Sequence, residues 1–555
     1  MIKYSATVFA IFASTIAFSQ QKDSTSNDPN LTKVVHVVTE YEPAISDANR
    51  INSLPQIEDT LSVRPTFKYS IISKPIHPEF ELTPINAAKM KGEPLTRLYR
   101  GIFTGGLGNY LSTLANLQLG SIRSKKMSFN SEFNHQGSFG DLKVNGVNQK
   151  ATISDNYMKL NGKRFLEKKE VYGSLGGKFD VFHTYGMPNN ITSSTDNIAL
   201  NYSTINIETG IRSLYTDSGA INYNMKPHFE LFKSKTDDEM GVGLESEVEK
   251  LMGIYSVTGL LNINYWDGID KTTDLFFNPF ATINQGHFKG KVGFATQLYA
   301  GGYSKFHLYP DVYAEYNVAD YIFVPFVVCN GYSQWGGIAK LVEENPYLAP
   351  GTKADPTSYN VNVTGGVKGL MTSFMSYSMS ATFSQVDNMR FFVNELPSSF
   401  SGESYVAWPI IKPNYYYSTV SSATNVLNFH GEIGYKKFEK LNLTYKFDYF
   451  SYDTKDIAKA YNKPSVVSTL NFRYDMQHKI IVNFDIFFVG ERPSTMGTAK
   501  GFVDANLGVE YRLTKRVSGF ANINNIAAQN YQYWANYPVQ RFNALFGFSY
   551  SFWGE

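Results

Sequence analysis

A two-residue alternation of apolar and polar side chains runs from about residue 97 to the end of the sequence. Three segments show it clearly: 441–449, 480–488 and 503–513 place apolar residues at every second position and polar or small residues between them. This period is the signature of β-strands with one apolar face. Its repetition over more than 400 residues predicts an all-β domain with many strands.

Three further features favour a membrane barrel over a soluble sandwich. Charges such as Lys226 and Glu230 stand in mid-strand, which suits a water-filled lumen. Short and long connections alternate, as they do in outer-membrane barrels. No segment after the N-terminus has 18 uncharged apolar residues, so membrane crossing requires strands. The third feature is the position of the tryptophans, which fall at proposed strand ends or in loops, where we expect aromatic girdles: Trp266, Trp335, Trp408, Trp534 and Trp553.

Counting the connections backward from the last strand predicts an antiparallel transmembrane barrel of about 22 strands over residues 97–555. The even count places both ends of the barrel domain in the periplasm of a Gram-negative bacterium. The expected strands begin near residues 97, 111, 127, 153, 169, 199, 221, 238, 253, 272, 287, 303, 321, 358, 374, 414, 440, 463, 478, 500, 516 and 541.

The N-terminal region divides into two parts. Residues 1–19 combine Lys3, an apolar run and small residues, which predicts a secretory signal peptide cleaved between Ser19 and Gln20. Residues 20–96 are rich in proline, which removes backbone donors and disfavours a regular sheet. We expect this Pro-rich segment to be extended, either in the periplasm or inside the barrel.

The last 55 residues resemble the final three strands of TonB-dependent outer-membrane receptors, in the style of the Bacteroidota. The resemblance rests on a Gly-containing strand, a short turn, a strand ending in Asn524 and Asn525, the Tyr-rich loop "QNYQYWANYP" and an aromatic last strand. It implies a transport or receptor barrel. It also implies that Phe546, Phe548, Tyr550 and Phe552 form the C-terminal signal read by the barrel-assembly machinery.

The N-terminal region departs from that family. Its members carry a plug domain of well over a hundred residues inside the barrel, whereas residues 20–96 show no recognisable plug pattern. The strand-like run Val34, Val35, His36, Val37 and Val38 resembles a TonB box, although one edge strand would read the same way. A 22-stranded barrel has a wide lumen. The filling must come from the long outer loops, the Pro-rich segment or a partner protein.

No catalytic, cofactor-binding or metal-binding motif stands out, and we expect no enzyme. His183 lies near Asp180 on one strand, but a solvated lumen position explains both. The acidic run 237–239 lacks the spaced ligands of a calcium loop and reads as a solvated turn. The segment "GGLGNY" at 105–110 lacks the residues of a phosphate loop and reads as a tight outer turn. The loop 333–357 has the pattern of one short helix ended by Pro346.

Composition excludes two further classes of function. The net charge of +2 gives no basic footprint for nucleic acid. The single cysteine, Cys329, excludes an intramolecular disulfide and a Cys-based zinc site.

Two functions remain open. The first is a transport or receptor barrel without a full plug, and the alternative is a structural or accessory subunit of an outer-membrane assembly or secretion complex. The expected partners are outer-membrane lipid, the barrel-assembly machinery during biogenesis, and a periplasmic or outer-membrane protein bound through residues 20–96.

Overall fold

The computed structural model describes residues 99–122, 124–144, 146–186, 199–215, 219–353, 355–394, 416–438, 440–495 and 497–554. These residues belong to one of two units of the chain, Thr96–Glu555. The signal peptide, the Pro-rich segment and the TonB-box-like run lie outside the described residues, so these three remain predictions.

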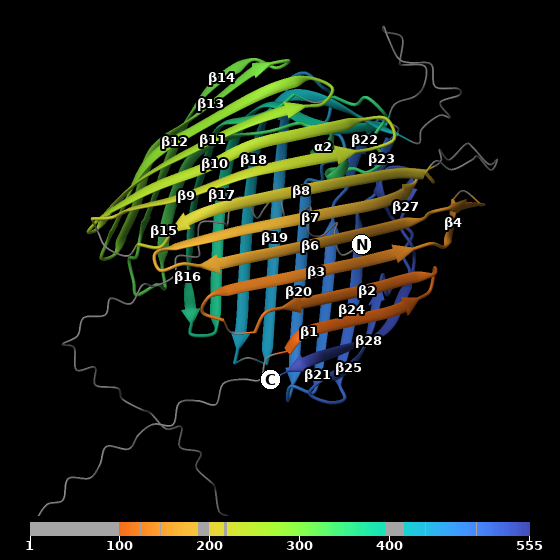
Figure 1. Ribbon diagram of the computed structural model, residues 1–555. Coiled ribbons are helices and arrows are strands. Elements are labelled where there is room, and N and C mark those ends of the chain that lie inside the picture. The colour runs from red at the N-terminus through yellow and green to blue at the C-terminus, as the bar shows by residue number, and fades with distance from the viewer. Residues whose placement is uncertain are drawn as a thin grey trace, which may run out of the picture. The chain divides into compact units, whose positions relative to one another are not determined.

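Twenty-two antiparallel strands form a closed barrel, which confirms the predicted fold and strand number (Figure 1). Each strand pairs with its neighbour in the sequence, and the last pairs with the first. The strands are β1 (Tyr99–Gly108), β2 (Ser112–Gly120), β3 (Met127–Ser138), β6 (Ile153–Phe165), β7 (Lys169–His183), β8 (Ala199–Ser213), β9 (Ile221–Lys233), β10 (Asp238–Met252), β11 (Tyr255–Asp267), β12 (Lys271–Gln285), β13 (Phe288–Gly301), β14 (Lys305–Tyr316), β15 (Val324–Gln334), β16 (Thr357–Thr372), β17 (Met375–Asn394), β18 (Tyr417–Lys437), β19 (Leu441–Thr454), β20 (Val466–Met476), β21 (Ile480–Val489), β24 (Phe502–Arg512), β25 (Val517–Asn524) and β28 (Asn543–Gly554).

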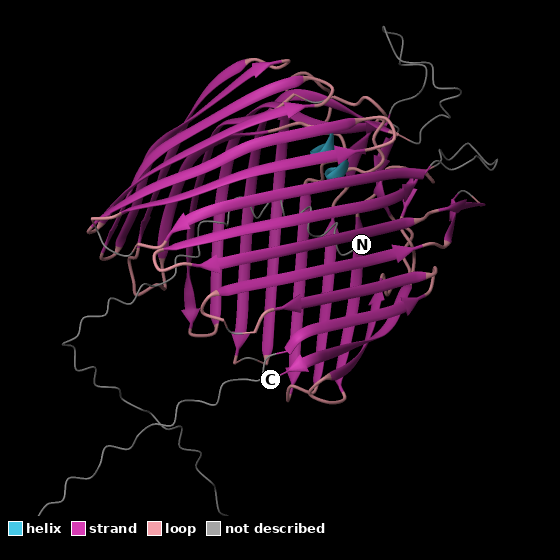
Figure 2. Ribbon diagram, viewed as in Figure 1, coloured by secondary structure: helices cyan, strands magenta, loops and turns pink. Residues whose placement is uncertain are grey.

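All of the barrel strands begin within three residues of the predicted positions. The outer loops contain further elements: the hairpins β4–β5 (Asp141–Val144, Val147–Lys150), β22–β23 (Arg492–Ser494, Gly497–Ala499) and β26–β27 (Gln532–Trp534, Tyr537–Pro538), and the helix α2 (Ile338–Glu344). Figure 2 shows α2 in cyan against a barrel made of strands. The helix ends just before Pro346, as predicted. Within the described residues, no helix is long and apolar enough to cross a membrane.

The outer surface of the barrel is an apolar belt. Directly paired residues share a face, so one row around the wall runs through Leu160, Leu175 and Ile207, which are 36%, 46% and 42% exposed. Large apolar side chains remain exposed at outward positions of most strands. Only a hydrocarbon phase covers such a belt favourably, and a closed barrel leaves no unpaired strand edge in it. The domain is thus an outer-membrane barrel, as predicted.

The opposite face of each strand is polar and lines the lumen. Lys226 of β9 forms an ion pair with Glu245 of β10, with Nζ and Oε2 2.7 Å apart. Lys291 of β13 and Asp311 of β14 form another, at 2.6 Å. The charges that the sequence places in mid-strand therefore face the lumen.

The seam between β28 and β1 explains the aromatic stripe at the C-terminus. Phe546 (62% exposed), Phe548 (52%) and Tyr550 (40%) face outward, while Ser549 faces inward and hydrogen bonds to Thr104 of β1 at 2.8 Å. The ring of Phe552 lies against Gly101, where a Cβ would come within 2.3 Å of it. Residues 105–110 form the end of β1 and the tight outer turn that was predicted.

The expected tryptophan girdles are wrong for three residues. Trp266 and Trp335 stack on each other with centroids 5.7 Å apart, on the lumen side beside the buried Tyr299. Trp534 is 8% exposed in the packed outer loops. These large flat side chains pack at the mouth of a wide barrel. The girdle prediction considers only the membrane interfaces and not the packing of the mouth. Trp553 is exposed at the periplasmic end, and Trp408 lies outside the described residues.

Candidate functional site at the outer mouth

The outer loops share one apolar core at the end of the barrel opposite to the short turns. Figure 1 shows α2, β4, β22, β23 and β27 at this end. We call the core the mouth core; its buried members are Leu142, Val144, Ala151, Phe182, Tyr185, Phe232, Ile338, Leu341, Val342, Tyr347, Leu348, Phe392, Tyr417, Trp534 and Tyr537. Several loops distant in sequence thus bury one cluster together.

The members of the mouth core come from opposite walls of the barrel. In the ring of 22 strands, β8 is the sixth and β18 is the sixteenth, so nine strands lie between them in one direction and eleven in the other. In a closed ring such strands face each other across the lumen. Tyr417 of β18 belongs to the mouth core, and Leu200 and Tyr202 of β8 pack against it, so the packed side chains extend over the lumen.

The segment 335–353, which we call the strap, makes this connection. On one side, Tyr202 of β8 donates its hydroxyl hydrogen bond to the carbonyl of Pro346 at 2.8 Å. On the other side, Tyr417 of β18 pairs with the strap in a short parallel bridge, with Tyr417 N to Tyr347 O and Ala349 N to Tyr417 O both 2.8 Å. The strap is hydrogen bonded to both walls.

Two acidic residues anchor the strap: Asp237, in the β9–β10 connection, and Glu239, at the start of β10. Glu239, 6% exposed, accepts a hydrogen bond from the backbone N–H of Ile338 at 3.0 Å and so caps the N-terminus of α2. Asp237 accepts one from the N–H of Gly351, also at 3.0 Å. The prediction of a solvated acidic turn is therefore wrong for Glu239 and Asp237, because the strap brings backbone N–H groups to these carboxylates, while Asp238 is exposed as expected. The described residues contain no group of three or more His, Cys, Asp or Glu side chains arranged to hold a metal ion.

The loop between β25 and β28 meets the strap over the lumen. The rings of Tyr347 and Tyr537 stack with centroids 3.9 Å apart. Tyr417 donates its hydroxyl hydrogen bond to the carbonyl of Ala535 at 2.8 Å, and Tyr185 donates its own to that of Pro538 at 3.1 Å. Burial raises the pKa of Tyr185 to about 12, so the hydroxyl stays protonated and remains a donor at physiological pH.

Arg492 of the β22–β23 hairpin joins a third loop to this arrangement. It is 3% exposed and donates to the carbonyls of Gln532, at 2.5 Å, and Tyr533. Its guanidinium also lies over the ring of Phe502, 5.4 Å from the centroid. A buried cation is costly unless its donors are satisfied. Here two backbone carbonyls replace water at Nη1 and Nη2 and an aromatic face covers the guanidinium, which fixes the hairpin to the neighbouring loop.

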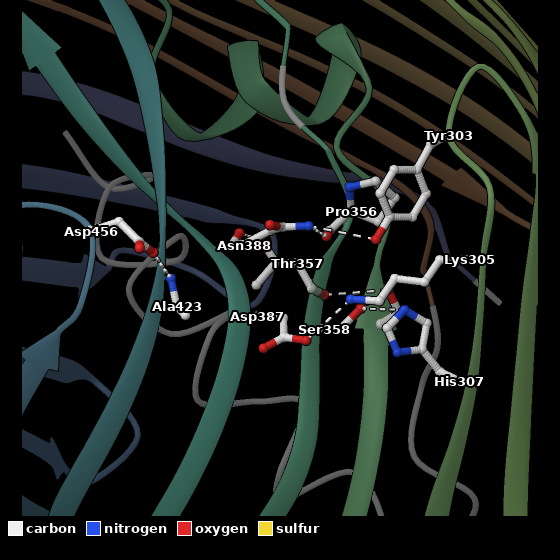
Figure 3. A network of polar contacts seen from close by, with 11 residues as sticks. Tyr303, Lys305, His307, Pro356, Thr357, Ser358, Asp387, Asn388, Ala423 and Asp456 are labelled. Atoms are coloured by element: carbon white, nitrogen blue, oxygen red, sulfur yellow. Dashed lines mark hydrogen bonds and ion pairs between the residues drawn. The ribbon is translucent and has the colours of Figure 1, made fainter.

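A polar network supports the strap where it rejoins the wall (Figure 3). A bulge in the pairing of β17 with β18 puts Asn388 at a φ of 52°. The carbonyl of Asn388 accepts a hydrogen bond at 2.8 Å from the hydroxyl of Thr357, the residue at which β16 begins after the strap. Beside it, Lys305 and Asp387 are paired at 3.2 Å and His307 contacts Ser358 at 3.3 Å. Bulges of this kind redirect strand ends at barrel rims.

The structure does not bring His183 and Asp180 together as a catalytic pair. They are three positions apart on β7 and therefore face opposite sides of the wall. The carboxylate of Asp180 lies 2.6 Å from Lys178, which shares the lumen side. The proposed assembly residues lie on β28 as expected, while their role in assembly stays a prediction.

Sequence reasoning missed most of the mouth core. Two signals were available: the tyrosines and tryptophan of "QNYQYWANYP" and the helix in loop 333–357, both of which place apolar side chains in long loops. Neither signal says which loops meet.

Comparisons with known proteins give a likeness of fold. No family model and no curated protein matches the sequence. Among solved structures, the FrpB iron transporter from Neisseria meningitidis (F3-3 variant) matches with a TM-score of 0.64 and 9% identity over 82% of both chains. The ferric-catecholate import receptor Fiu from E. coli K12 matches with a TM-score of 0.60 and 10% identity, again over 82% of both chains.

The pyoverdine outer-membrane receptor FpvA from Pseudomonas aeruginosa PAO1 matches with a TM-score of 0.61 and 10% identity, over 82% of this chain and 79% of that chain. The matched 82% of this chain is close to the fraction of the sequence that lies between residues 99 and 554. At these identities the likeness concerns the fold alone. The barrel resembles those of TonB-dependent outer-membrane receptors.

Proposed function

We propose that the protein is a transport or receptor barrel of the outer membrane, without a full plug domain, whose outer mouth is closed by its own loops. The single observation that carries this proposal is the strap, which is hydrogen bonded to the sixth and the sixteenth strands of the ring. The fold supports it too, because the similar structures are an iron transporter, a ferric-catecholate import receptor and a pyoverdine receptor.

Closure has a physical reason in a barrel of this size. A 22-stranded ring encloses a lumen wide enough for an aqueous channel unless something fills it. The sequence leaves three candidates for filling the lumen: the outer loops, the Pro-rich segment and a partner protein. Among these, the outer loops are supported by contacts between described residues across the lumen. The lumen wall behind the strap is polar, so water and solute enter it once the loops move apart. Transport would then depend on opening of the mouth core, a loop motion of the kind that gates many sites.

Conductance in planar bilayers tests this function. The mature protein is compared with a variant in which the strap, residues 335–353, is replaced by a short Gly-Ser linker, each with and without residues 20–96. We expect the intact barrel to be nearly silent and the strapless barrel lacking residues 20–96 to conduct steadily. The matched control is Lys340→Ala with Glu343→Ala, which removes an exposed ion pair of α2 and should leave the barrel closed.

Two results would contradict the proposal. Silence of all variants, including the one that lacks both segments, would sink the transport function. Equal conductance with and without the strap would show that the loops do not close the mouth. The accessory-subunit alternative is not favoured by the comparisons. It predicts instead that affinity purification of the tagged native protein recovers stoichiometric partners.

A further inference from the structure

A groove marks the outer surface of the barrel at the periplasmic ends of β3, β6 and β7. Its volume is about 590 Å³. The residues that the argument uses are Met127, Phe129, Gly162, Arg164, Val171 and Gly173, all of which line it. The turns 121–126 and 166–168, which connect these strands, belong to the short-turn end of the barrel.

The strand register places these side chains on the lipid-facing surface. Phe129 pairs with Gly162 and Gly162 with Gly173, which makes one row across the three strands. Met127, Arg164 and Val171 form the next row toward the periplasm. The rows face outward, because Met127, Phe129 and Val171 are 56%, 49% and 42% exposed and belong to the apolar belt.

Two adjacent glycines form the floor of the groove. A Cβ added at Gly162 would meet no atom within 4 Å, and one at Gly173 would meet none closer than 3.4 Å. Neither glycine has a positive φ, so no turn requires them here. This row has no side chain on two neighbouring strands, whereas Phe129 stands at its end and Met127 and Val171 stand in the next row, so a slot is left in the surface. Its apolar walls suit a hydrocarbon chain.

Cations stand at the periplasmic edge of the slot. Arg164 is exposed and lies in a lipid-facing row, and Lys126 is exposed on the adjoining turn. In the part of the chain that the structure describes, neither side chain forms an ion pair. The sequences of the two turns, "SIRSKK" and "LEK", contain four basic residues and one acidic residue, and Lys169 follows at the start of β7. An outward-facing Arg is tolerated near the membrane interface, and its planar guanidinium matches a phosphate group.

We propose that this groove binds an anionic glycerophospholipid of the periplasmic leaflet. The phosphate lies against Arg164 and Lys126, and one acyl chain lies over Gly162 and Gly173. The apolar slot, the unpaired cations and their depth at the periplasmic interface together fit this ligand. The inference is independent of the transport function, since it concerns the outside of the wall.

Native mass spectrometry of the mature protein in detergent tests the proposal. The probes are phosphatidylglycerol, phosphatidylcholine with matched acyl chains, and inorganic phosphate. One variant, Arg164→Gln with Lys126→Gln, removes the cations, and another, Gly162→Phe, fills the slot, which has room for a side chain. The matched control is Lys515→Gln with Arg516→Gln, on the β24–β25 turn of the same rim. Heat-modifiable migration on gels verifies that each barrel is folded.

We expect one phosphatidylglycerol to be retained by the wild type and the control, and its apparent affinity to fall about tenfold in both groove variants. Phosphatidylcholine should be retained much less. Equal retention of the two lipids, or unchanged retention in both groove variants, would overturn the proposal. Displacement of the lipid by millimolar inorganic phosphate would also overturn it, because it would indicate a site for free phosphate.

Discussion

The wall and the mouth of this barrel are held together in different ways. In the wall, each strand pairs with its sequence neighbour, and the backbone register fixes which side chains face lipid and which face water. In the mouth, contacts join residues far apart in the sequence, such as Tyr202 with Pro346 and Tyr185 with Pro538. The wall therefore forms by pairing of strands that are adjacent in sequence, with one long-range pairing that closes the ring. The mouth forms only when side chains from several loops pack together.

This difference predicts that defects in the wall stop assembly and defects in the mouth open a finished barrel. The seam between β28 and β1 is the part of the wall that closes last in the sequence. In the mouth, the stack of Tyr347 on Tyr537 is the corresponding long-range contact, because it joins two loops over the lumen.

Gly547→Phe should have the largest effect. A Cβ at Gly547 would lie 2.2 Å from the carbonyl oxygen of Gly105 and 2.4 Å from the ring of Phe520, so the seam has no room for a side chain. Overpacking usually costs about 1–3 kcal/mol, and a contact with backbone adds to it. We expect most of the inserted barrel to be lost, measured as heat-modifiable protein in outer-membrane fractions. Gly259→Phe is the control, since a Cβ there meets no atom within 4 Å.

Phe552→Ala should lower the amount of inserted barrel to a smaller extent. It removes the ring that covers Gly101 across the seam and the last aromatic residue of the proposed assembly signal. Deletion of Gly554 and Glu555 should change little. Insertion of Phe552→Ala at the level of the wild type would refute the assigned role.

Tyr537→Ala should leave the wall intact and loosen the mouth. Tyr537 is 2% exposed and stacks on Tyr347, and loss of a large buried aromatic side chain costs about 3–5 kcal/mol. We expect protease added outside the cells to cut the outer loops, with unchanged heat-modifiable migration. Tyr445→Ala, on the lipid-facing surface, is the matched control. Loops as resistant as those of the wild type would argue against a shared mouth core.

Tyr417→Phe should have the smallest effect of the series. It keeps the buried ring and removes one hydrogen bond, from the hydroxyl to the carbonyl of Ala535. Such a bond contributes about 0.5–1.5 kcal/mol. The rate of loop cleavage should rise severalfold and remain below that of Tyr537→Ala. A larger effect than that of Tyr537→Ala would contradict the view that buried aromatic rings, rather than single hydrogen bonds, contribute most to the stability of the mouth.

The difference between the wall and the mouth also explains which features could be predicted from the sequence. Period-2 alternation and turn spacing give the strand number and boundaries, because strand pairing in this fold follows sequence order. The glycines and aromatic residues of the seam are readable for the same reason.

The mouth could not be predicted, because it depends on which loops meet. Nothing in residues 237–239 indicates that Glu239 caps a helix about a hundred positions later, so the sequence alone predicts a solvated turn there. The position of Trp266 near a strand end predicts a girdle residue, but the strand register puts its side chain on the lumen side, where it stacks on Trp335. The lipid groove requires the register of three strands, which places Gly162 beside Gly173.

The central claim, that the strap closes the outer mouth, is tested most directly by labelling a lumenal thiol in intact cells. Glu247→Cys, in a Cys329→Ser background, places a thiol at an exposed, lumen-facing position of β10. Lys143→Cys provides an exposed position on the outer hairpin β4–β5. With a membrane-impermeant maleimide outside the cells, we expect rapid labelling at position 143 and none at position 247 until the strap, residues 335–353, is replaced by a linker. Labelling at position 247 as fast as at position 143, with the strap intact, would contradict the account.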